Sequence, residues 1–357
     1  MKKIGIISFY FKNYNYGGIL QAYALEHFLN HKLKDVHAEQ ICYDRNKVKL
    51  PIWDRVLRFI CRGSLKKKFL ARVPKRSIDL SNCSAIRCFE KEAITHSKKV
   101  YDGNDYVEAQ NDYDIFICGS DQIWNPIAIR DAYLLIGISK KKISYAASIA
   151  AGRLRLPEII RLKKGLADFS AISVREESAK KQIEPLTDKR IVTVVDPVLL
   201  LTEEDWDDII CEPIVSESYI FTYFLGTVGE SALEYARMSV QNHKKIVSVS
   251  GLEFGYSAME EMVLDECGPR EFLSLVKNAD EVWTDSFHAL IFSIIYERQF
   301  RVFSREGAVA DMSERIRDIL NMVELPATEQ RDFKRAKQIL NQKREQSVEF
   351  LKKSIYD

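Results

Sequence analysis

The 357-residue sequence has no long hydrophobic run, and this absence argues against a membrane-spanning segment. No apolar segment approaches the about 18 residues that a membrane-spanning helix needs. The first residues, MKKIGIISFYF, lack a small-residue cleavage site and continue into polar residues, so we expect a first strand rather than a signal peptide. We therefore expect a cytoplasmic protein that contacts the inner face of the membrane peripherally, if at all.

The sequence also lacks the common metal and dinucleotide motifs. Its 7 cysteines include no CxxC pair, and several lie inside apolar runs. They predict reduced, partly buried thiols and not a disulfide or zinc framework. The first expected strand is followed by the loop Lys12–Gly18 and not by GxGxxG, so a dinucleotide fingerprint is absent.

Net charge is small, at +2, but it is unevenly distributed. Residues 45–100 contain 16 Lys and Arg against 4 Asp and Glu, which favours a local anionic partner over nucleic-acid binding. Five apolar residues of this basic block fall near one face of a helix: Trp53, Val56, Leu57, Phe59 and Ile60. The pattern fits a helix on an anionic membrane surface. It also fits an ordinary insertion packed on its own domain, which we favour because solvated charged faces are common.

The stretch Asp114–Pro126, DIFICGSDQIWNP, combines a short apolar run with a polar cluster. This order predicts a buried strand that ends at an exposed turn. In open α/β sheets, ligands bind beyond the carboxyl ends of such strands, so we expect Ser120, Asp121, Gln122 and Asn125 to stand in a cleft. The alternative is that these residues only turn the chain and cap the next segment.

Strands that end in polar clusters recur along the chain. The expected strands are Ile4–Phe11, Glu39–Tyr43, the one that runs into Ser120, Lys142–Ser148, Ala171–Val174, Ile191–Val195, Tyr219–Leu225, Lys245–Ser250, Glu281–Thr284 and Phe300–Phe303. Helices are expected between them, the first at Ile19–Asn30. We predict an α/β fold with two Rossmann-like domains facing a cleft. Their expected ranges are 1–197 with a basic helical insertion at 45–110, then 198–327, and a helical tail at 328–357.

Several motifs occur in the order that a known family shows. They are the NYGG loop with ILQAYAL, CGSDQIWNP, KISYAAS, SVREES, VVDPVLLL, GPREFL and TDSFHALIFSI, between about Ile4 and Phe303. In that order they resemble the polysaccharide pyruvyl transferase family. The resemblance implies a GT-B-like, metal-independent enzyme without a cofactor, which takes phosphoenolpyruvate as donor. It would attach the pyruvyl group as a cyclic ketal to a sugar of a surface polysaccharide or of its lipid-diphosphate-linked precursor, and release phosphate.

The resemblance implies a donor site on the second domain. His288 stands at a strand-to-helix turn, and histidine is the side chain best suited to act as acid or base near neutral pH. Its alternative is a hydrogen-bonded histidine packed against Phe287. Arg175 follows a strand, and a guanidinium binds carboxylate or phosphate with two prongs. Its alternative is an ion pair with Glu176 or a neighbouring acid.

One departure from the family concerns the charge near the histidine. Many relatives carry Arg-Leu-His-Gly where this sequence has Ser-Phe-His-Ala, so Ser286 replaces a cation. Either Arg175 and another basic residue such as Arg305 supply the charge, or donor binding differs here from what the family suggests. Ser286 can still donate a hydrogen bond to the donor.

The acceptor is expected on the first domain. Asn15, Tyr16 and Gly17 of the NYGG loop, with the polar cluster from Ser120 to Asn125, are the predicted acceptor-binding residues. The paired glycines of that loop either bring backbone N–H groups close to an anion at the helix start or only make the turn.

Two rival functions remain open at this stage. A GT-B glycosyltransferase would use a nucleotide sugar, and Glu306 with Glu314 has the E-x7-E spacing of some such enzymes, although an acid-rich chain offers such pairs by chance. A catalytically inactive carbohydrate-binding relative would keep the fold without the chemistry.

Overall fold

The computed structural model describes residues 1–47, 80–126, 128–150, 153–225, 238, 244–249, 261–264, 266–303, 313–326 and 331–357. Several expectations lie outside these residues. They concern the apolar helix face at Trp53–Ile60, Arg305, Glu306 and, apart from Met238, the helix that the sequence favours at Glu230–Asn242.

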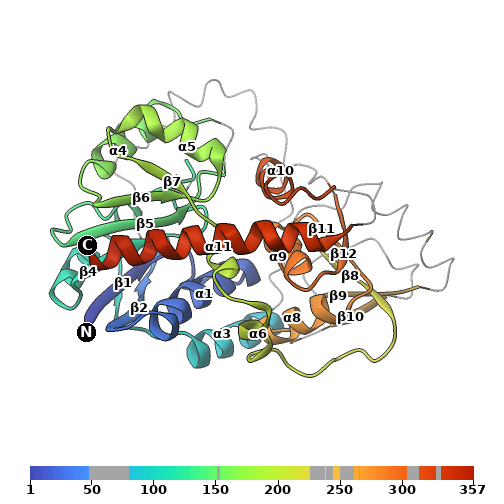
Figure 1. Cartoon of the computed structure of the whole chain (residues 1–357). Helices are drawn as coiled ribbons and strands as arrows, with labels where there is room; N and C mark the ends of the chain where they lie inside the picture. The colour runs from blue at the N-terminus through green and yellow to red at the C-terminus, as the bar shows by residue number, and fades with distance from the viewer. Residues whose placement is uncertain are drawn as a thin grey trace, which may run out of the picture.

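Two sheets of parallel strands form the framework (Figure 1). The first has seven strands in the order β3-β2-β1-β4-β5-β6-β7, and the second has five in the order β10-β9-β8-β11-β12. The strands of the first sheet are β1 Lys2–Ile7, β2 Val36–Tyr43, β3 His96–Tyr101, β4 Ile115–Cys118, β5 Lys141–Ala147, β6 Ala171–Val174 and β7 Ile191–Thr193. Those of the second are β8 Tyr219–Tyr223, β9 Lys245–Val249, β10 Glu261–Leu264, β11 Glu281–Thr284 and β12 Gln299–Val302.

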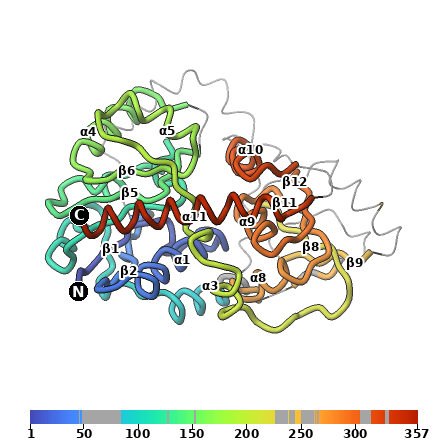
Figure 2. The backbone as a smooth tube through the Cα atoms, viewed as in Figure 1, coloured from blue at the N-terminus to red at the C-terminus, as the bar shows by residue number. Residues whose placement is uncertain are grey.

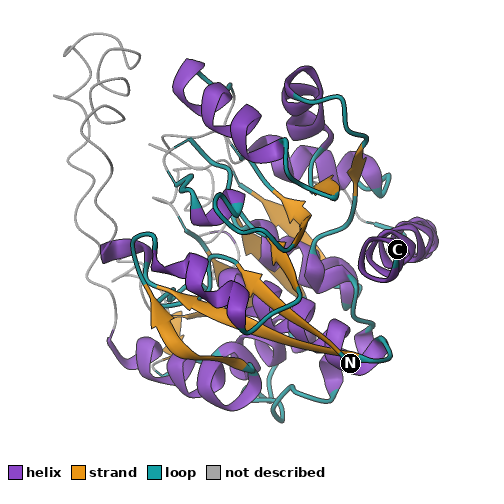
Figure 3. Ribbon diagram, turned by 90° about the vertical axis from the view of Figure 1, so that its left-hand side faces the viewer, coloured by secondary structure: helices purple, strands orange, loops and turns teal. Residues whose placement is uncertain are grey.

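Helices connect the strands and lie on both sides of the sheets (Figure 3). The α-helices are α1 Tyr16–Lys32, α3 Leu80–Ala93, α4 Leu156–Leu166, α5 Glu177–Ile183, α6 Glu203–Asp207, α8 Pro269–Asn278, α9 Phe287–Ile295, α10 Ser313–Met322 and α11 Phe333–Tyr356. The 3-10 helices are η1 Arg45–Lys47, η3 Asp105–Asn111, η4 Ala132–Leu134, η5 Glu184–Leu186 and η6 Pro197–Leu199. The predicted class, two α/β domains with a C-terminal helix, is confirmed.

Local sequence explains where several elements begin. β4 is fully buried along IFIC, as its unbroken apolar run predicts for a central parallel strand. Thr202 caps α6 and forms a reciprocal capping box with Asp205. Every residue of α9 is buried, because this apolar helix passes between the second sheet and its neighbouring helices.

The structure differs from the sequence-based expectation at the start of α1 and in four elements that were not expected. α1 begins at Tyr16 and not at Ile19, because the Asn15 side chain caps it and accepts a hydrogen bond from the Gly18 N–H at 3.3 Å. The expected elements did not include α3 or α10, or the strands β3 and β10. Both strands lie at sheet edges, and β3 carries three exposed residues among its six, so its apolar pattern is weak.

The stretch 45–110, expected to be an insertion, contains β3 and α3. β3 pairs with β2 at the edge of the first sheet, and α3 packs against α1 and α8. The predicted domain boundary after 197 falls between the last strand of the first sheet and the first strand of the second.

The C-terminal helix ties the two domains together. α11 runs from the second domain back across the first, so the two chain ends lie near each other (Figures 1 and 2). The Lys2 ammonium donates to the carbonyl of Ile355 at 2.7 Å, and the backbone N–H of Val195 donates to the Ser347 hydroxyl at 3.0 Å. On the second domain, α11 packs against α9, and Lys337 pairs with Glu297 at 2.5 Å. The predicted helical tail is therefore a single brace over both domains.

A continuous apolar core crosses from one domain to the other. It joins α1 of the first domain to α8 and α9 of the second. Tyr16 stacks on Phe272 with ring centroids 4.6 Å apart, and its hydroxyl donates to the carbonyl of Cys267 at 2.7 Å. A second core fills the opposite face of the first sheet. None of the helices in the described ranges combines the length and hydropathy that crossing a bilayer requires.

Glu26, on α1, generates a stability prediction. The residue is 4% exposed, and burial raises the pKa of its carboxyl to about 7, although hydrogen bonds involving Thr95 and Asn30 oppose the rise. Because the folded-state pKa exceeds the unfolded value, wild-type stability should fall as the pH rises from about 4.5 to about 7. Glu26→Gln should remove this loss and increase the free energy of unfolding at pH 8 by up to about 3 kcal/mol, at about 1.4 kcal/mol per pKa unit.

Urea unfolding at pH 5 and pH 8 measures this difference. Glu345→Gln, at an exposed position of α11, serves as the control and should show no such pH-dependent gain. A Glu26→Gln protein that is less stable than wild type at pH 8 would contradict the assignment.

Candidate functional site

A cavity of about 370 Å³ opens between the two domains. Its walls come from the segments that follow β1, β2 and β4 on one side, and from those that follow β8 and β11, together with α10, on the other. β1 with β4, and β8 with β11, are the neighbours at which each sheet reverses its strand order. Doubly wound sheets bind ligands at such switch points. The lining residues are Phe9, Asn13, Asn15, Arg45, Asp121, Gln122, Asn125, Ala128, Leu225, Ser286, Phe287, His288 and Arg315.

The first-domain wall contains four of the predicted acceptor residues, namely Asn15, Asp121, Gln122 and Asn125. The carbonyl of Asp121 accepts hydrogen bonds from the backbone N–H groups of Ile123 at 2.8 Å and Ser148 at 3.0 Å. These bonds fix the turn after β4 to the end of β5. The polar side chains are therefore held by rigid strands and not by a free loop.

The second-domain wall is the N-terminus of α9. Ser286 is the N-cap, and its side chain accepts from the Ala289 N–H at 3.5 Å, while its own N–H donates to the Thr284 hydroxyl at 2.9 Å. His288 lies in the first turn and lines the cavity. Backbone N–H groups at a helix start carry partial positive charge, so this wall favours an anion.

Gly17 brings the two walls together. An ideal Cβ on Gly17 would lie 2.0 Å from Nδ1 of His288, so only glycine lets the imidazole approach α1 this closely. The paired glycines were expected in a loop, whereas they lie in the first turn of α1. The observed contact of Gly17 is with the histidine of the other domain.

Behind the cavity, the buried carboxylate of Asp196 lies between Arg175 of the first domain and His288 of the second. Its Oδ2 accepts from Nη1 of Arg175 at 2.7 Å and lies 3.6 Å from Nε2 of His288, while its Oδ1 accepts from the Val198 N–H at 3.1 Å. Burial alone would raise the pKa of Asp196, but His288 and Arg175 outweigh it and hold that pKa well below its usual range. Asp196 is therefore an anion that lies between Arg175 of its own domain and His288 of the other.

Arg175 lies inside this ion-pair group and not on the cavity wall. Its side chain is 3% exposed, Nη2 lies 3.4 Å from Oε1 of Glu176, and its guanidinium carbon is 4.4 Å from the ring centroid of Phe287. The sequence-based alternative of an ion pair with Glu176 is present, but it is buried rather than on the surface. In this arrangement Arg175 holds internal carboxylates in place.

Two other predicted residues also lie away from the cavity lining. Ser120 is fully buried and donates to the Ala146 carbonyl at 3.1 Å. Tyr16 packs in the apolar domain interface. Predicted roles for both in acceptor binding remain predictions.

Sequence reasoning did not select several residues that shape the site, among them Phe9, Asn13, Arg45, Asp196 and Arg315. A signal was available for Asp196, which ends a strand in the quoted motif VVDPVLLL just as other polar residues end theirs. No sequence signal pointed to Arg315, because it lies on α10, which was not among the expected elements.

Arg315, on α10, contacts residues of both cavity walls. It is 3% exposed, and its guanidinium carbon lies 5.3 Å from the ring centroid of Phe287. With the Gln122 amide turned so that its oxygen faces the guanidinium, that oxygen accepts from Nη1 at 3.1 Å and Nη2 at 2.9 Å. A cation of the second domain thereby positions a polar group of the first.

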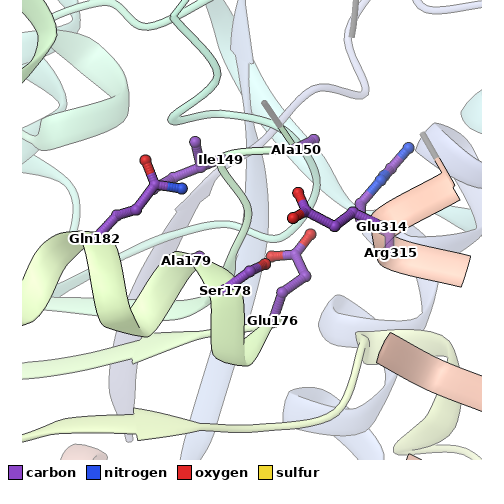
Figure 4. Close-up of a pocket in the computed structure, with 8 residues that line it drawn as sticks. All are labelled: Ile149, Ala150, Glu176, Ser178, Ala179, Gln182, Glu314 and Arg315. Carbon is purple, nitrogen blue, oxygen red and sulfur yellow. The ribbon is translucent and has the colours of Figure 1, made fainter. Parts of the chain in front are cut away.

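A second, much smaller cavity of about 10 Å³ lies beside the first, with room for about one water molecule (Figure 4). Glu176 points across it toward Glu314 and Arg315 of α10. Glu314, one half of the E-x7-E pair, lines this small cavity, while Glu306 lies outside the described residues.

The arrangement can bind anions and move protons. Arg45, Arg315 and the start of α9 present positive charge to the cavity, and the imidazole of His288 can carry a proton. Nε2 of His288 makes no hydrogen bond to any described residue. Within the described ranges, no group of three or more His, Cys, Asp or Glu side chains is placed to hold a metal ion.

Known structures share the fold at low sequence identity. The S. aureus MnaA structure with UDP has a TM-score of 0.50 and 10% identity over 98% of this chain and 88% of that one. A UDP-GlcNAc 2-epimerase from Methanocaldococcus jannaschii gives 0.49 and 13% over 97% and 92%. The UDP-GlcNAc-bound 2-epimerase from Neisseria meningitidis gives 0.48 and 11% over 100% and 95%. The architecture of the chain is thus GT-B-like.

Sequence comparison gives the family. No curated protein sequence is significantly similar to the chain. A model of the polysaccharide pyruvyl transferase family matches residues 15–307, which include α1, the turn after β4, Asp196 and the start of α9. The chain belongs to the polysaccharide pyruvyl transferase family.

Proposed function

We propose that the protein transfers the pyruvyl group of phosphoenolpyruvate to two hydroxyls of a sugar, forming a cyclic ketal and releasing phosphate. The observation that carries the proposal is the cavity in which His288 of one domain faces Asn15, Asp121 and Gln122 of the other. A group-transfer enzyme must bring its donor and acceptor together in this way.

The reaction sets clear demands on the side chains. The methylene carbon of the donor gains a proton, one sugar hydroxyl attacks the neighbouring carbon, the bond to the phosphate oxygen breaks, and the second hydroxyl closes the ring. Of the two protons that the hydroxyls lose, one balances the methyl group and the other leaves with phosphate. His288 is the group that would exchange these protons, since an imidazole works as acid and base near neutral pH.

The donor's two anionic groups need positive charge. The start of α9 and Arg315 supply it on the second-domain wall, where Ser286 adds a hydrogen-bonding group. Arg175 would act through Asp196, and not by direct contact with the donor as first expected, because its guanidinium already pairs with Asp196 and Glu176. Asn15, Asp121, Gln122 and Asn125 would orient the sugar hydroxyls.

Phosphate release from phosphoenolpyruvate in the presence of pooled galactose-, glucose- and mannose-containing acceptors tests this function. Wild type should release phosphate only when acceptor is present. His288→Ala should lower the rate at least about 100-fold, the usual range for loss of a general acid or base. His31→Ala, at an exposed position near the end of α1, should leave the rate unchanged.

Absence of both phosphate release and thermal protection by phosphoenolpyruvate would contradict the donor assignment, because a ligand of the folded state must stabilise it. Protection by nucleotide sugars in its place would favour a glycosyltransferase. Binding of saccharides without turnover would indicate an inactive carbohydrate-binding relative.

Asp196→Asn should separate positioning from chemistry. Because the folded-state pKa of Asp196 is lowered, its contribution to stability is present above about pH 4 and is lost as the pH falls further. Removing this anion leaves Arg175 and Glu176 as an incomplete buried pair, so we expect about 3–5 kcal/mol of destabilisation at pH 7. The difference from wild type should shrink as the pH falls below about 4.

For the same variant, the pH profile of kcat/KM should shift if Asp196 holds His288 in its working state. Urea unfolding at several pH values and the rate profile of the folded fraction measure the two effects. An unchanged rate profile would mean that Asp196 has only a structural role.

Gly17→Ala should be harmful although alanine usually favours a helix over glycine by about 1 kcal/mol. The added methyl would collide with the imidazole of His288, so the ring must leave its position. We expect a loss of activity of at least tenfold with lower thermal stability. Retention of full activity would show that the close approach is unnecessary.

A further inference from the structure

One cation of the cavity is not used by the proposed chemistry. Arg45 lies in η1, directly after β2, on the first-domain wall. Its guanidinium carbon is 4.6 Å from the ring centroid of Phe9, and that ring meets Tyr133 edge-on at 4.7 Å. Tyr133 is almost completely buried, so Phe9 is a fixed platform that holds the guanidinium at the cavity.

The acids nearest to Arg45 in sequence and on the adjoining loop are bound by lysines. Asp44 pairs with Lys12 at 2.5 Å, and Asp102 pairs with Lys47 at 3.4 Å. Among the described residues, no carboxylate lies within ion-pair distance of Arg45. Its positive charge is therefore directed at the cavity with an aromatic ring, rather than an acid, as its support.

The groups that the proposed function assigns to the donor lie on the opposite wall. His288, Arg315 and the start of α9 all belong to the second domain. Arg45 lies instead with Asn13 and Asn15 on the wall assigned to the acceptor. A cation there is suited to an anion carried by the second substrate.

We propose that Arg45, stacked on Phe9, binds an anionic group of the acceptor, so that the enzyme selects acidic sugars over neutral ones. The anion is a phosphate ester, as on a lipid-diphosphate-linked sugar, or the carboxylate of a uronic acid. Both present two oxygens to the guanidinium fork. The assignment of this wall to the acceptor rests on the proposed function.

Binding in the absence of phosphoenolpyruvate is the first test. Thermal unfolding is followed at constant ionic strength with the 1-phosphate, the uronic acid and the methyl glycoside of galactose, glucose and mannose. At least one acidic sugar should raise the Tm of wild type, and its methyl glycoside should not. Arg45→Ala should abolish the rise, whereas Lys47→Ala, which removes a charge from the same turn outside the cavity, should retain it.

The two anion sources separate in this assay. A shift with the 1-phosphate alone assigns Arg45 to a phosphate, and a shift with the uronic acid alone assigns it to a carboxylate. Equal shifts with the neutral glycosides, or a shift that Arg45→Ala retains, would overturn the proposal.

Steady-state rates of phosphate release provide the second test. Wild type should prefer the acidic member of a sugar pair at least tenfold in kcat/KM, and Arg45→Ala should erase that preference through the KM of the acceptor. The KM for phosphoenolpyruvate should change less than twofold. An increase in the KM for phosphoenolpyruvate instead would place Arg45 at the donor and refute the acceptor assignment.

The proposed function and this inference can fail separately. Wild type that releases no phosphate, and gains no stability from phosphoenolpyruvate, has a different donor. If acidic sugars still stabilise that wild type and not Arg45→Ala, the anionic subsite stands. If phosphoenolpyruvate turns over equally well with neutral and acidic sugars, the function stands and the subsite falls.

Discussion

The buried carboxylate of Asp196 is the interaction on which the site depends. It binds Arg175 of its own domain at 2.7 Å and stands 3.6 Å from His288 of the other. Separating a buried ion pair costs several kcal/mol because each charge then lacks its partner. Asp196 therefore keeps its charge paired with Arg175 inside the first domain and, behind the cavity, also reaches His288 of the second domain.

Two helices, α1 of the first domain and α9 of the second, start close to this anion. α1 and α9 both begin at the cleft, one from each domain, and Gly17 of the first accepts the imidazole of the second without a side chain between them. Farther from the cavity the same interface is apolar, with Tyr16 stacked on Phe272. α11 then braces both domains from outside, because it packs against α9 of the second domain and bonds to Lys2 and Val195 of the first. The stacked rings of this interface and α11 thus hold the polar site in place, although neither contributes side chains to the cavity lining.

Much of this fold could be predicted from sequence because its central strands are short and continuously apolar. β6 and β11 occur at the predicted residues, Ala171–Val174 and Glu281–Thr284. The edge strand β3 alternates too weakly for such a prediction, since its lysines face solvent. The start of α1 was wrong by one turn because Gly17 and Gly18 are typical of loops, and only the cap from Asn15 shows that they belong to the helix.

The site was predictable where polar residues directly follow strands, and not where the structure pairs them. Asp121, Gln122 and His288 reach the cavity because the strand ends place them there. The ion pair between Arg175 and Asp196 spans 21 positions, and local sequence contains no information about which carboxylate a given arginine will meet. Arg315 enters the cavity from a helix, so no strand-end rule identifies it. Arg45 does follow a strand, β2, but it also begins the basic stretch that was expected to be an insertion.

The pairing of Arg175 changes how the serine at position 286 is understood. The proposed donor carries a carboxylate and a phosphate, and Ser286 supplies no positive charge to either. Because Arg175 pairs with Asp196 and Glu176, the positive charge on the second-domain wall comes from Arg315 and from the start of α9. An arginine at 286 would add charge directly beside the histidine. Ser286 instead caps α9 through the Ala289 N–H, and the partial positive charge at the start of this helix lies at the cavity wall.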